Sequence, residues 1–334
     1  MPEASGNRAE EENVLIQAED LCATILPRLG GKIASIRLGA HELLQPPLIA
    51  RGPRTRTMRF DESDAGGWDE CLPSVAPCTV ETAAGPASIP DHGDLWRVAW
   101  QRVAKTDHAD GESDANSMTF RGECFSLPLA LERTLTLKEA GKGWQVRLNY
   151  RVTNTGNHAS PWSWAAHPLF AVGAGDRIVL PGSIHTLRLE GSGRGRLGKS
   201  GDQVSWPVAA QAYGAKTDLS VVQREASAIG DKLFAGPLSE AEHWCALERP
   251  ALGARIWFGF DPAATPYLGL WLCYGGWPER PGPKQMCVAL EPSTAPVDSL
   301  AITGPWSRTL APGESFSWPM VVEIELLTGI DRHA

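Results

Sequence analysis

Two ionisable side chains stand in segments whose residue types suit proton transfer. His167 lies in the segment Ser160–Phe170, and Glu291 ends the apolar run that begins at Met286. Each is followed by proline, which disfavours helical backbone for the preceding residue and holds it extended. An imidazole and a carboxylate are common general acids and bases in proteins. The two segments therefore predict a site for acid–base chemistry.

Both residues share one further pattern. Side chains alternate between two faces of an extended segment, so the neighbours on each face can be read from the residue numbers. His167 and Glu291 each share a face with small residues and lie opposite large ones. The small residues are Ser163, Ala165, Cys287 and Ala289, and the large ones are Trp162, Trp164, Met286, Val288 and Leu290. Small neighbours leave space for a ligand beside a group that is costly to bury unpaired.

Three other segments hold polar residues in settings that suit ligand recognition. His92 precedes Gly93 in a turn that leads into an apolar stretch. A second segment follows the glycine pair Gly66-Gly67 and contains Trp68, Asp69 and Glu70. A third is Asp231–Phe234. An indole ring can pack against the apolar face of a ligand ring, and carboxylates accept hydrogen bonds from hydroxyls.

The elements that must position these residues are strands. Apolar and polar residues alternate with a period of two in three long segments, which is the signature of half-buried strands. These segments are 129–137, 144–152 and 316–326, and shorter ones are 32–38, 95–103, 255–260 and 267–273. Glycine and proline turn signals separate them. Helical periodicity is weak everywhere, with 238–247 as the best candidate for a helix.

The fold class that follows is all-β, with one large antiparallel β-sandwich. No linker of changed composition divides the chain and no fixed repeat is evident, so residues 13–334 are predicted to form a single domain after a solvated N-terminal tail at 1–12. The two longest irregular stretches, Pro46–Asp94 and Glu190–Ile229, are predicted to be loops that cover a site or one end of the sandwich.

Composition excludes several classes of partner. The chain has 334 residues and a formal charge of −8, which argues against a broad basic face for nucleic acid or anionic membranes. No apolar run is long enough to span a bilayer, and the N-terminus lacks the pattern of a signal peptide. The seven cysteines form no CxxC pair, which indicates free thiols in a reducing, cytoplasmic compartment.

The run Arg51–Arg59 holds four arginines and has two readings. It is either a solvated loop or a contact for an anion such as phosphate. Gly191–Arg196 lacks the strand and helix that flank a phosphate-binding glycine loop, so a turn is the better reading. Motifs for nucleotide, zinc-peptidase or serine-hydrolase chemistry are absent from the sequence.

Taken in order, these segments resemble the aldose 1-epimerase (galactose mutarotase-like) family. The matching pieces run through nearly the whole chain. They are Gly30–Ile36, His92-Gly93 with Trp96, Pro161–Phe170 with His167-Pro168, Asp231–Phe234, and Leu290–Thr294. The resemblance implies a β-supersandwich of some twenty-odd strands, with a ligand cleft on the concave face of one sheet.

The resemblance also implies roles for residues. His167 corresponds to the general acid and Glu291 to the general base. His92 corresponds to a second histidine that contacts sugar hydroxyls or the ring oxygen, and Asp231 to a substrate-binding aspartate. Many members have an arginine ahead of the histidine-glycine motif. This chain has Gly67–Cys71 there, which makes Trp68, Asp69 and Glu70 candidates for hydroxyl recognition.

The implied activity is that of an isomerase that interconverts the α- and β-anomers of a small-molecule aldose. Such chemistry needs a carboxylate and a protonated imidazole, and it requires no metal, nucleotide or redox cofactor. Because a nearby carboxylate favours the charged form of histidine, Glu291 is expected to favour the protonated form of His167. The catalytic pair does not select among aldoses, and periodicity makes no prediction of oligomeric state.

Three alternatives stay open. The first is a non-catalytic carbohydrate-binding protein on the same fold, because fold alone does not determine function. The second is a mutarotase for a hexose 6-phosphate, with Arg51–Arg59 as the phosphate site. The third is a lyase or hydrolase that acts on polysaccharides.

Overall fold

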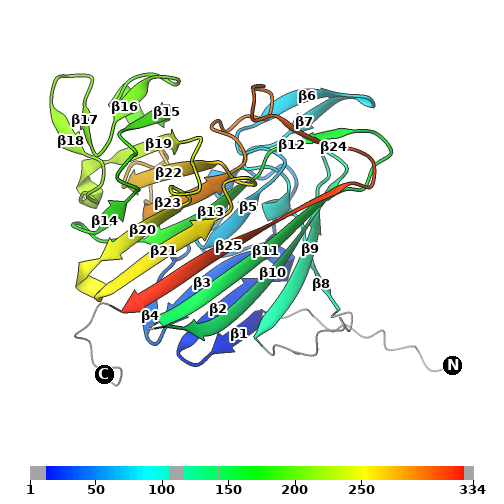
Figure 1. The fold of residues 1–334 in the computed structure, drawn as a ribbon, viewed down its shortest axis with the longest axis horizontal. Coiled ribbons are helices and arrows are strands. Elements are labelled where there is room, and N and C mark those ends of the chain that lie inside the picture. Colours follow the sequence, from blue (N-terminus) through cyan, green and yellow to red (C-terminus); the bar gives the residue numbers. More distant parts are fainter. Residues whose placement is uncertain (1–12, 105–115, 142, 327–334) are drawn as a thin grey trace.

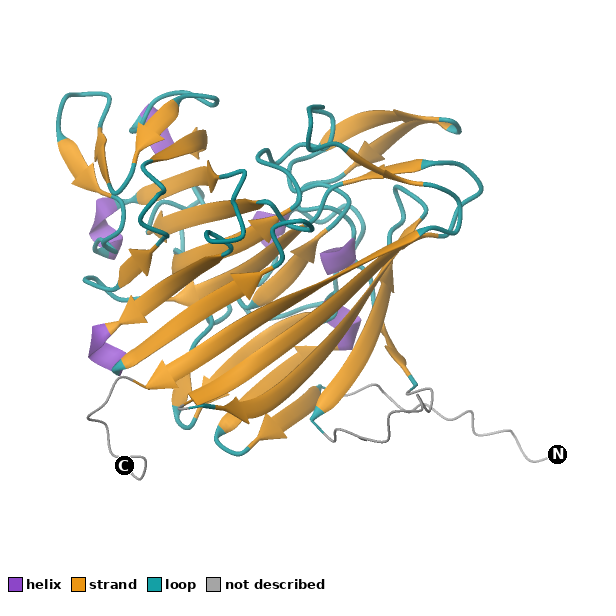
Figure 2. Ribbon diagram, in the orientation of Figure 1, coloured by secondary structure: helices purple, strands orange, loops and turns teal. Residues whose placement is uncertain are grey.

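The structure is a computed structural model that describes residues 13–104, 116–141 and 143–326. This part contains 25 β-strands and six short 3-10 helices, so the predicted all-β class is confirmed (Figures 1 and 2). The predicted N-terminal tail at 1–12 lies outside the described residues. None of the six helices in the described part is long and apolar enough to cross a membrane.

The larger of the two main sheets has eleven strands, and every neighbouring pair is antiparallel. Its order is β1 (Val14–Ala18), β2 (Leu21–Leu26), β3 (Lys32–Leu38), β5 (Trp68–Cys71), β13 (Ala165–Ala171), β23 (Met286–Ser293), β22 (Tyr267–Tyr274), β19 (Ile229–Ala235), β15 (Thr186–Ser192) and β16 (Gln203–Ser205), with β4 (His41–Glu42) paired to β3. The segments that carry His167 and Glu291 are therefore neighbouring central strands.

The second main sheet has eight strands and lies in front of the first in Figure 1. Its order is β14 (Arg177–Val179), β20 (Trp244–Arg249), β21 (Ala254–Phe260), β25 (Ser315–Leu326), β11 (Gly143–Asn154), β10 (Leu129–Ala140), β9 (Ser117–Glu123) and β8 (Gln101–Val103). The three longest alternating segments of the sequence form its centre, as β10, β11 and β25.

Smaller elements complete the described part. The short sheets pair β12 (Ser160–Trp162) with β24 (Arg308–Leu310), β17 (Val208–Ala210) with β18 (Lys216–Asp218), and β6 (Cys78–Thr82) with β7 (Gly85–Ile89). The helices are η1 (Pro27–Leu29), η2 (Phe60–Glu62), η3 (Leu95–Arg97), η4 (Gly193–Gly195), η5 (Glu225–Ser227) and η6 (Pro250–Leu252). The two predicted irregular stretches thus contain short strands and turns.

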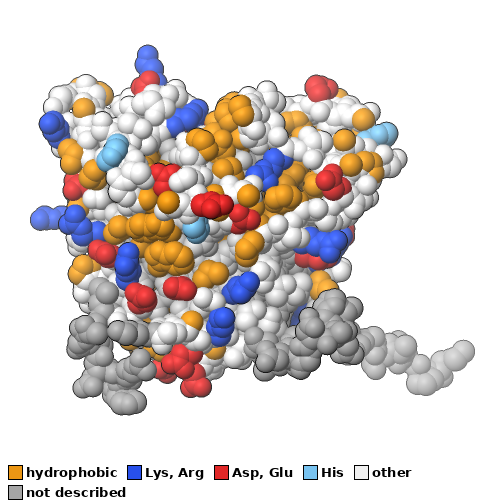
Figure 3. Space-filling view, viewed as in Figure 1, with side chains coloured by type: hydrophobic (Ala, Val, Ile, Leu, Met, Phe, Trp, Pro, Cys, Tyr) orange, Lys and Arg blue, Asp and Glu red, His pale blue; other side chains and the backbone are white. Residues whose placement is uncertain are grey.

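The core lies between the two main sheets. On the eight-stranded sheet, Leu135, Leu148 and Met320 are partners across three adjacent strands, and all are buried. They belong to one hydrophobic cluster with residues of the eleven-stranded sheet such as Val288 and Leu290. The opposite face of the eight-stranded sheet carries acidic and basic side chains interspersed with hydrophobic ones, with no broad basic area in the view of Figure 3.

The predicted alternation around Glu291 is present in the packing. Val288 and Leu290 point into the core between the sheets, whereas Cys287 and Ala289 belong to a separate small cluster with Leu169. That second cluster lies on the other face of the eleven-stranded sheet because alternate side chains of a strand point to opposite faces. Glu291 shares this outer face.

Two predicted elements differ from the structure. The segment 95–103 was expected to be one strand, but Leu95–Arg97 form a 3-10 turn and only Gln101–Val103 pair as a strand. Leu95, Trp96 and Trp100 are all buried. In a strand with one exposed face, every second side chain would instead face solvent. The helix candidate at 238–247 is not helical, since Trp244–Arg249 form β20. All seven cysteines are free, as predicted.

Candidate active site

A cavity of about 210 Å³ opens on the outer face of the eleven-stranded sheet. Strands β13, β19, β22 and β23 form its floor, and loops from the irregular stretch Pro46–Asp94 and from the segment after β23 form its walls. Its lining residues are Phe60, Val75, Ala76, Pro77, Asp91, His92, His167, Lys232, Trp271, Trp277, Gln285, Glu291 and Asp298. Aromatic faces and polar groups are thus combined in one small concave site, as is usual for small-molecule sites.

His167 and Glu291 face each other in this cavity. The antiparallel pairing of β13 with β23 brings them together, and 4.0 Å separates His167 Nε2 from Glu291 Oε1. That distance is too long for a direct hydrogen bond. Glu291 Oε1 and His167 Nδ1 have no hydrogen-bond partner among the described residues, although both are buried. The pair therefore has unused hydrogen-bonding capacity beside the cavity.

The other carboxylate oxygen of Glu291 is held by Lys232. The Lys232 ammonium donates to Glu291 Oε2 and lies 3.8 Å from Asp298 Oδ1. Strand β22 separates the two residues, and Gly269 is the residue of β22 that pairs with Glu291. A Cβ atom at Gly269 would lie 3.0 Å from Glu291 Oε2, so the glycine provides the space in which the ion pair forms.

Burial dominates the protonation of the pair. It raises the pKa of Glu291, while the positive charge of Lys232 opposes that rise. Burial also lowers the pKa of His167 well below 6.5, and the charges of His92 and Lys232 lower it further. The pKa of His167 therefore shifts in the direction opposite to the one that a neighbouring carboxylate favours. The reasons are that burial removes the hydration of the imidazolium and that the positive charge of Lys232, which is paired with Glu291, also disfavours it.

His92 stands beside His167 in a constrained turn. Its ring stacks on Phe60 with centroids 3.9 Å apart and lies across the ring of His167 at 5.1 Å. Its Nδ1 contacts Asp91 Oδ1 at 2.9 Å. The backbone of His92 is left-handed, with φ of 58°, and residues other than glycine rarely adopt this conformation. Gly93 follows with φ of 68°, and a Cβ there would collide with the Leu72 carbonyl.

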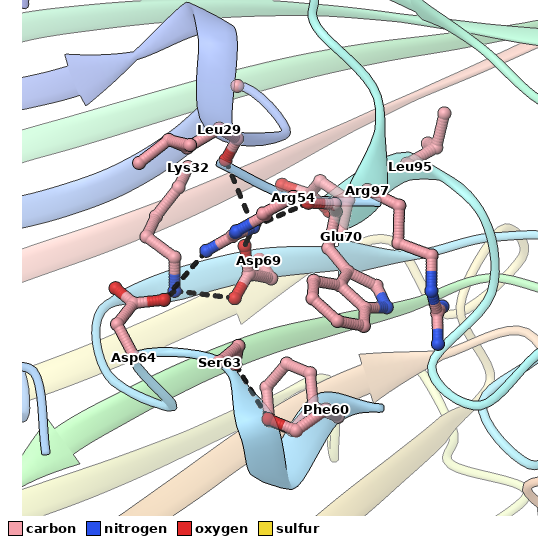
Figure 4. Close-up of polar contacts among 12 residues, drawn as sticks. Leu29, Lys32, Arg54, Phe60, Ser63, Asp64, Asp69, Glu70, Leu95 and Arg97 are labelled. Atoms are coloured by element: carbon pink, nitrogen blue, oxygen red, sulfur yellow. Dashed lines mark hydrogen bonds and ion pairs between the residues drawn. The ribbon is translucent and has the colours of Figure 1, made fainter. Parts of the chain in front are cut away.

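A buried network of charges holds the wall that carries Phe60 (Figure 4). Lys32 Nζ contacts Asp69 Oδ2 at 2.6 Å and Asp64 Oδ1 at 3.6 Å. Arg54 contacts Asp64 at 2.7 Å and Asp69 at 3.3 Å. Because Asp64 and Arg54 belong to the loop while Lys32 and Asp69 lie on β3 and β5, the network ties the loop to the sheet. Phe60 lies on η2 within that loop.

The three residues predicted to recognise hydroxyls do not line the cavity. Trp68 is buried in the core against Phe258, with ring centroids 6.4 Å apart. Asp69 belongs to the network just described. Glu70 is buried and accepts hydrogen bonds from Arg133, Tyr150 and Trp164. All three side chains therefore have structural partners of their own.

Asp231 also lies away from the cavity. Its carboxylate accepts from Ser192 Oγ at 2.6 Å and pairs with Arg196. The adjacent residue, Lys232, lines the cavity instead, because neighbouring residues on a strand point to opposite faces. The resemblance thus located the correct strand, but the side chain that enters the cavity is one residue further along.

The arginine run has other partners as well. Arg51 and Arg54 pair with Asp64, and Arg59 pairs with Asp61. The guanidinium of Arg56 lies over the ring of Phe125 at 4.8 Å. None of the four lines the cavity. The reading of this run as a phosphate site is therefore not supported by its position.

Sequence reasoning missed several cavity residues. Lys232 had a signal, since it lies on an apolar strand at a position whose side chain is opposite that of Asp231. Phe60 and Asp298 had none, because both lie in irregular segments whose course only the folded chain determines. The remaining missed residues are Val75, Ala76, Pro77, Asp91, Trp271, Trp277 and Gln285.

One family model and several solved structures are similar to this chain. Residues 79–200 match the family model described as aldose 1-epimerase. The resemblance to that family is confirmed. The search of curated protein sequences found no match to this chain.

Solved structures confirm the galactose mutarotase-like fold. The Slr1438 protein of Synechocystis sp. superposes with a TM-score of 0.67 at 16% identity, covering 98% of this chain and 100% of the other. A galactose mutarotase-like protein from Lactobacillus casei superposes with a TM-score of 0.63 at 17% identity. The match covers 94% of this chain and 100% of the other. A galactose mutarotase related enzyme from Lactobacillus acidophilus superposes with a TM-score of 0.62 at 12% identity. The match covers 96% of this chain and 99% of the other. At identities this low, the comparisons show a similarity of fold alone.

Proposed function

We propose that the protein is an aldose 1-epimerase that interconverts the α- and β-anomers of a neutral aldose. The observation that carries the proposal is the pairing of His167 Nε2 with Glu291 Oε1 at 4.0 Å in the cavity. Anomer exchange acts on two oxygens, the C1 hydroxyl and the ring oxygen, which are bonded to the same carbon. An acid and a base only 4.0 Å apart suit two oxygens that lie so close together.

In this mechanism Glu291 Oε1 is the general base and His167 the general acid. Glu291 removes the proton of the C1 hydroxyl, the C1–O1 bond becomes a carbonyl, and the bond from C1 to the ring oxygen breaks. The ring oxygen takes the proton of His167. Rotation about the C1–C2 bond presents the other face of the aldehyde, and closure returns each proton. Each positioned acid or base contributes about 10²- to 10⁴-fold to such a reaction.

The shifted pKa values support this use of the pair. Burial raises the pKa of Glu291 and lowers that of His167, so the affinities of the two groups for a proton come closer together. Ring opening moves one proton onto Glu291 and one away from His167, and ring closure reverses both transfers. Opposite shifts of this kind favour a reversible exchange, because they reduce the preference of a proton for the imidazole over the carboxylate.

A neutral aldose fits the charges of the cavity better than a sugar phosphate does. Among the described lining residues, Lys232 is the one lysine or arginine, and it is paired with Glu291 and lies near Asp298. Three carboxylates, those of Asp91, Glu291 and Asp298, line the same cavity and would repel a phosphate. The rings of Trp271 and Trp277 offer flat apolar surfaces of the kind that contact sugar rings.

The test is anomer exchange followed by NMR or polarimetry on α-D-glucose and α-D-galactose. We expect the protein to accelerate exchange, and Glu291→Gln and His167→Asn each to lose most of the acceleration while remaining folded. Glu323→Gln, on the outer face of the eight-stranded sheet, is the matched control and should keep it. A double variant of Glu291 and His167 with near-normal turnover would refute the assignment.

A carbohydrate-binding protein is the second candidate. Under that reading a folded protein would bind sugars measurably by calorimetry but would not accelerate anomer exchange on any aldose tested. The orphaned atoms of His167 and Glu291 favour the enzyme, because a binder needs hydroxyl partners but no close acid–base pair.

A further inference from the structure

Asp298 stands on a rigid stretch of backbone after β23. Its carbonyl accepts hydrogen bonds from the N–H groups of Val75 and Ala76, at 2.9 and 2.8 Å, and from Ser74 Oγ at 3.0 Å. Its own N–H donates to Glu190 Oε1 at 3.3 Å. Contacts to two separate segments therefore hold the main chain of Asp298 against the cavity wall.

The side chain of Asp298, by contrast, is unsatisfied. It lines the cavity, yet Oδ1 is buried and has no hydrogen-bond partner in the described part of the chain. The neighbouring cation, Lys232 Nζ, lies 3.8 Å from Oδ1, beyond hydrogen-bond distance. Leaving a buried carboxylate oxygen without a donor is costly. A rigidly mounted acceptor with no donor is what a ligand hydroxyl would satisfy.

Lys232 supplies the complementary donor. An ammonium has three N–H groups, and Glu291 Oε2 is its hydrogen-bond acceptor among the described residues. A hydroxyl can accept a hydrogen bond and donate one at the same time. Placed beside the 3.8 Å gap, one ligand hydroxyl accepts from Lys232 Nζ and donates to Asp298 Oδ1. Both bonds involve a charged group, which makes them stronger than neutral ones.

The position of this pair identifies the hydroxyl. Lys232 holds Glu291 Oε2, while Oε1 of the same carboxylate faces His167, where the C1 hydroxyl reacts under the proposed function. The anomeric carbon is bonded to its own oxygen, to the ring oxygen and to C2. The hydroxyl on the adjacent carbon is therefore the one at C2.

We propose that Lys232 and Asp298 form a hydroxyl-binding pair for the C2 hydroxyl, so that the site selects aldoses that carry a free hydroxyl beside the anomeric carbon. This inference rests on the proposed function and extends it to the class of substrate. Asp298 takes the substrate-binding role that the resemblance implied for Asp231.

A cycle of variants and substrates tests the pair. Anomer exchange is measured for wild type and Asp298→Asn on D-glucose and 2-deoxy-D-glucose, and on D-galactose and 2-deoxy-D-galactose, with 3-deoxy-D-glucose as the control sugar. Wild-type kcat/KM is expected to fall about 10- to 100-fold when the C2 hydroxyl is removed. Asp298→Asn should lose a similar factor on the parent sugars and discriminate less than about threefold against the 2-deoxy sugars.

Asp91→Asn is the matched variant, because Asp91 is another carboxylate of the same cavity. It should retain the wild-type discrimination against 2-deoxy sugars, whatever its own activity. Urea unfolding checks that both variants are folded. The inference is overturned if wild type does not discriminate, or if Asp298→Asn discriminates as strongly as wild type.

Failure of the proposed function is a separate outcome. If wild type accelerates no aldose, calorimetric binding of D-glucose and 2-deoxy-D-glucose to wild type and Asp298→Asn decides the inference independently. Loss of affinity for the 2-deoxy sugar in wild type but not in the variant supports the pair. Equal affinities, or no binding of either sugar, overturn it.

Discussion

Lys232 on β19 and Glu291 on β23 form an ion pair across the whole of strand β22, at the place where Gly269 carries no side chain. The ion pair engages one carboxylate oxygen of Glu291 and leaves the other directed at His167. It therefore determines both the charge of the proposed base and the single oxygen that can act. The register of three strands, rather than any short motif, creates this arrangement.

Removing the charge of Lys232 should make Glu291 harder to ionise. In Lys232→Met the buried carboxylate loses the cation that opposes the rise of its pKa, so the acid limb of the pH profile should move to higher pH. We expect kcat/KM at neutral pH to fall about 10- to 100-fold. Lys232→Arg keeps the charge and should keep the limb near its wild-type position. An unchanged profile in Lys232→Met would contradict this role.

The wild-type pH profile follows from the number of protons that His167 and Glu291 hold together. Exchange needs one proton on His167 and Glu291 together, since two protons leave no base and none leaves no acid. Because burial lowers the pKa of His167 well below 6.5, the imidazolium is lost as pH rises. We expect kcat/KM to decline between about pH 6 and about pH 8, approaching tenfold per unit. The measurement is anomer exchange with the uncatalysed rate subtracted, and a flat profile over this range would oppose the assignment.

Filling the space above β22 should disturb the ion pair. In Gly269→Ala the new Cβ lies 3.0 Å from Glu291 Oε2 and 3.2 Å from a ring atom of Phe234, so the carboxylate must shift. We expect about a tenfold loss of kcat/KM and a destabilisation of about 1–3 kcal/mol from overpacking. Gly191→Ala is the matched control, because a Cβ at that strand position meets nothing within 4 Å. Equal kinetics in the two variants would show that the space is not needed.

The buried pair of Glu70 and Arg133 should matter for stability. Burial raises the pKa of Glu70 to about 6, and Arg133 limits that rise. A carboxyl whose folded-state pKa is raised stabilises the fold below its unfolded pKa, and this stability is lost as pH rises through the folded pKa. For Glu70 the loss amounts to about 2 kcal/mol by neutral pH. Arg133→Met should cost about 3–5 kcal/mol more there, because it leaves a buried charge unpaired.

Urea unfolding at about pH 5 and about pH 8 measures this effect. The loss caused by Arg133→Met should be smaller at the lower pH, where Glu70 can take up a proton. The double variant Arg133→Met/Glu70→Gln should recover part of the stability at the higher pH. Its amide oxygen can still accept from Trp164 Nε1, while its NH2 group can donate to the hydroxyl oxygen of Tyr150. Identical losses in the single and double variants at both pH values would refute the argument.

The order of residues was enough to predict most of the strands and to single out His167 and Glu291. Alternation with a period of two is a local property, so β10, β11 and β25 could be predicted from the order of residues alone. The same alternation placed His167 and Glu291 on a face of small residues. Local patterns failed where burial removed the alternation, as at Leu95–Arg97, and where helical periodicity was weak, as at 238–247.

Which other side chains reach the cavity depends on how the strands and loops pack together. A shift of one residue along β19 turns Asp231 toward Ser192 and Arg196 and brings Lys232 to Glu291. Phe60 and Asp298 arrive from loops held by ion pairs and backbone hydrogen bonds to distant segments. Such contacts depend on sheet register and loop course, which join residues far apart in the chain. No local pattern of residue types encodes them.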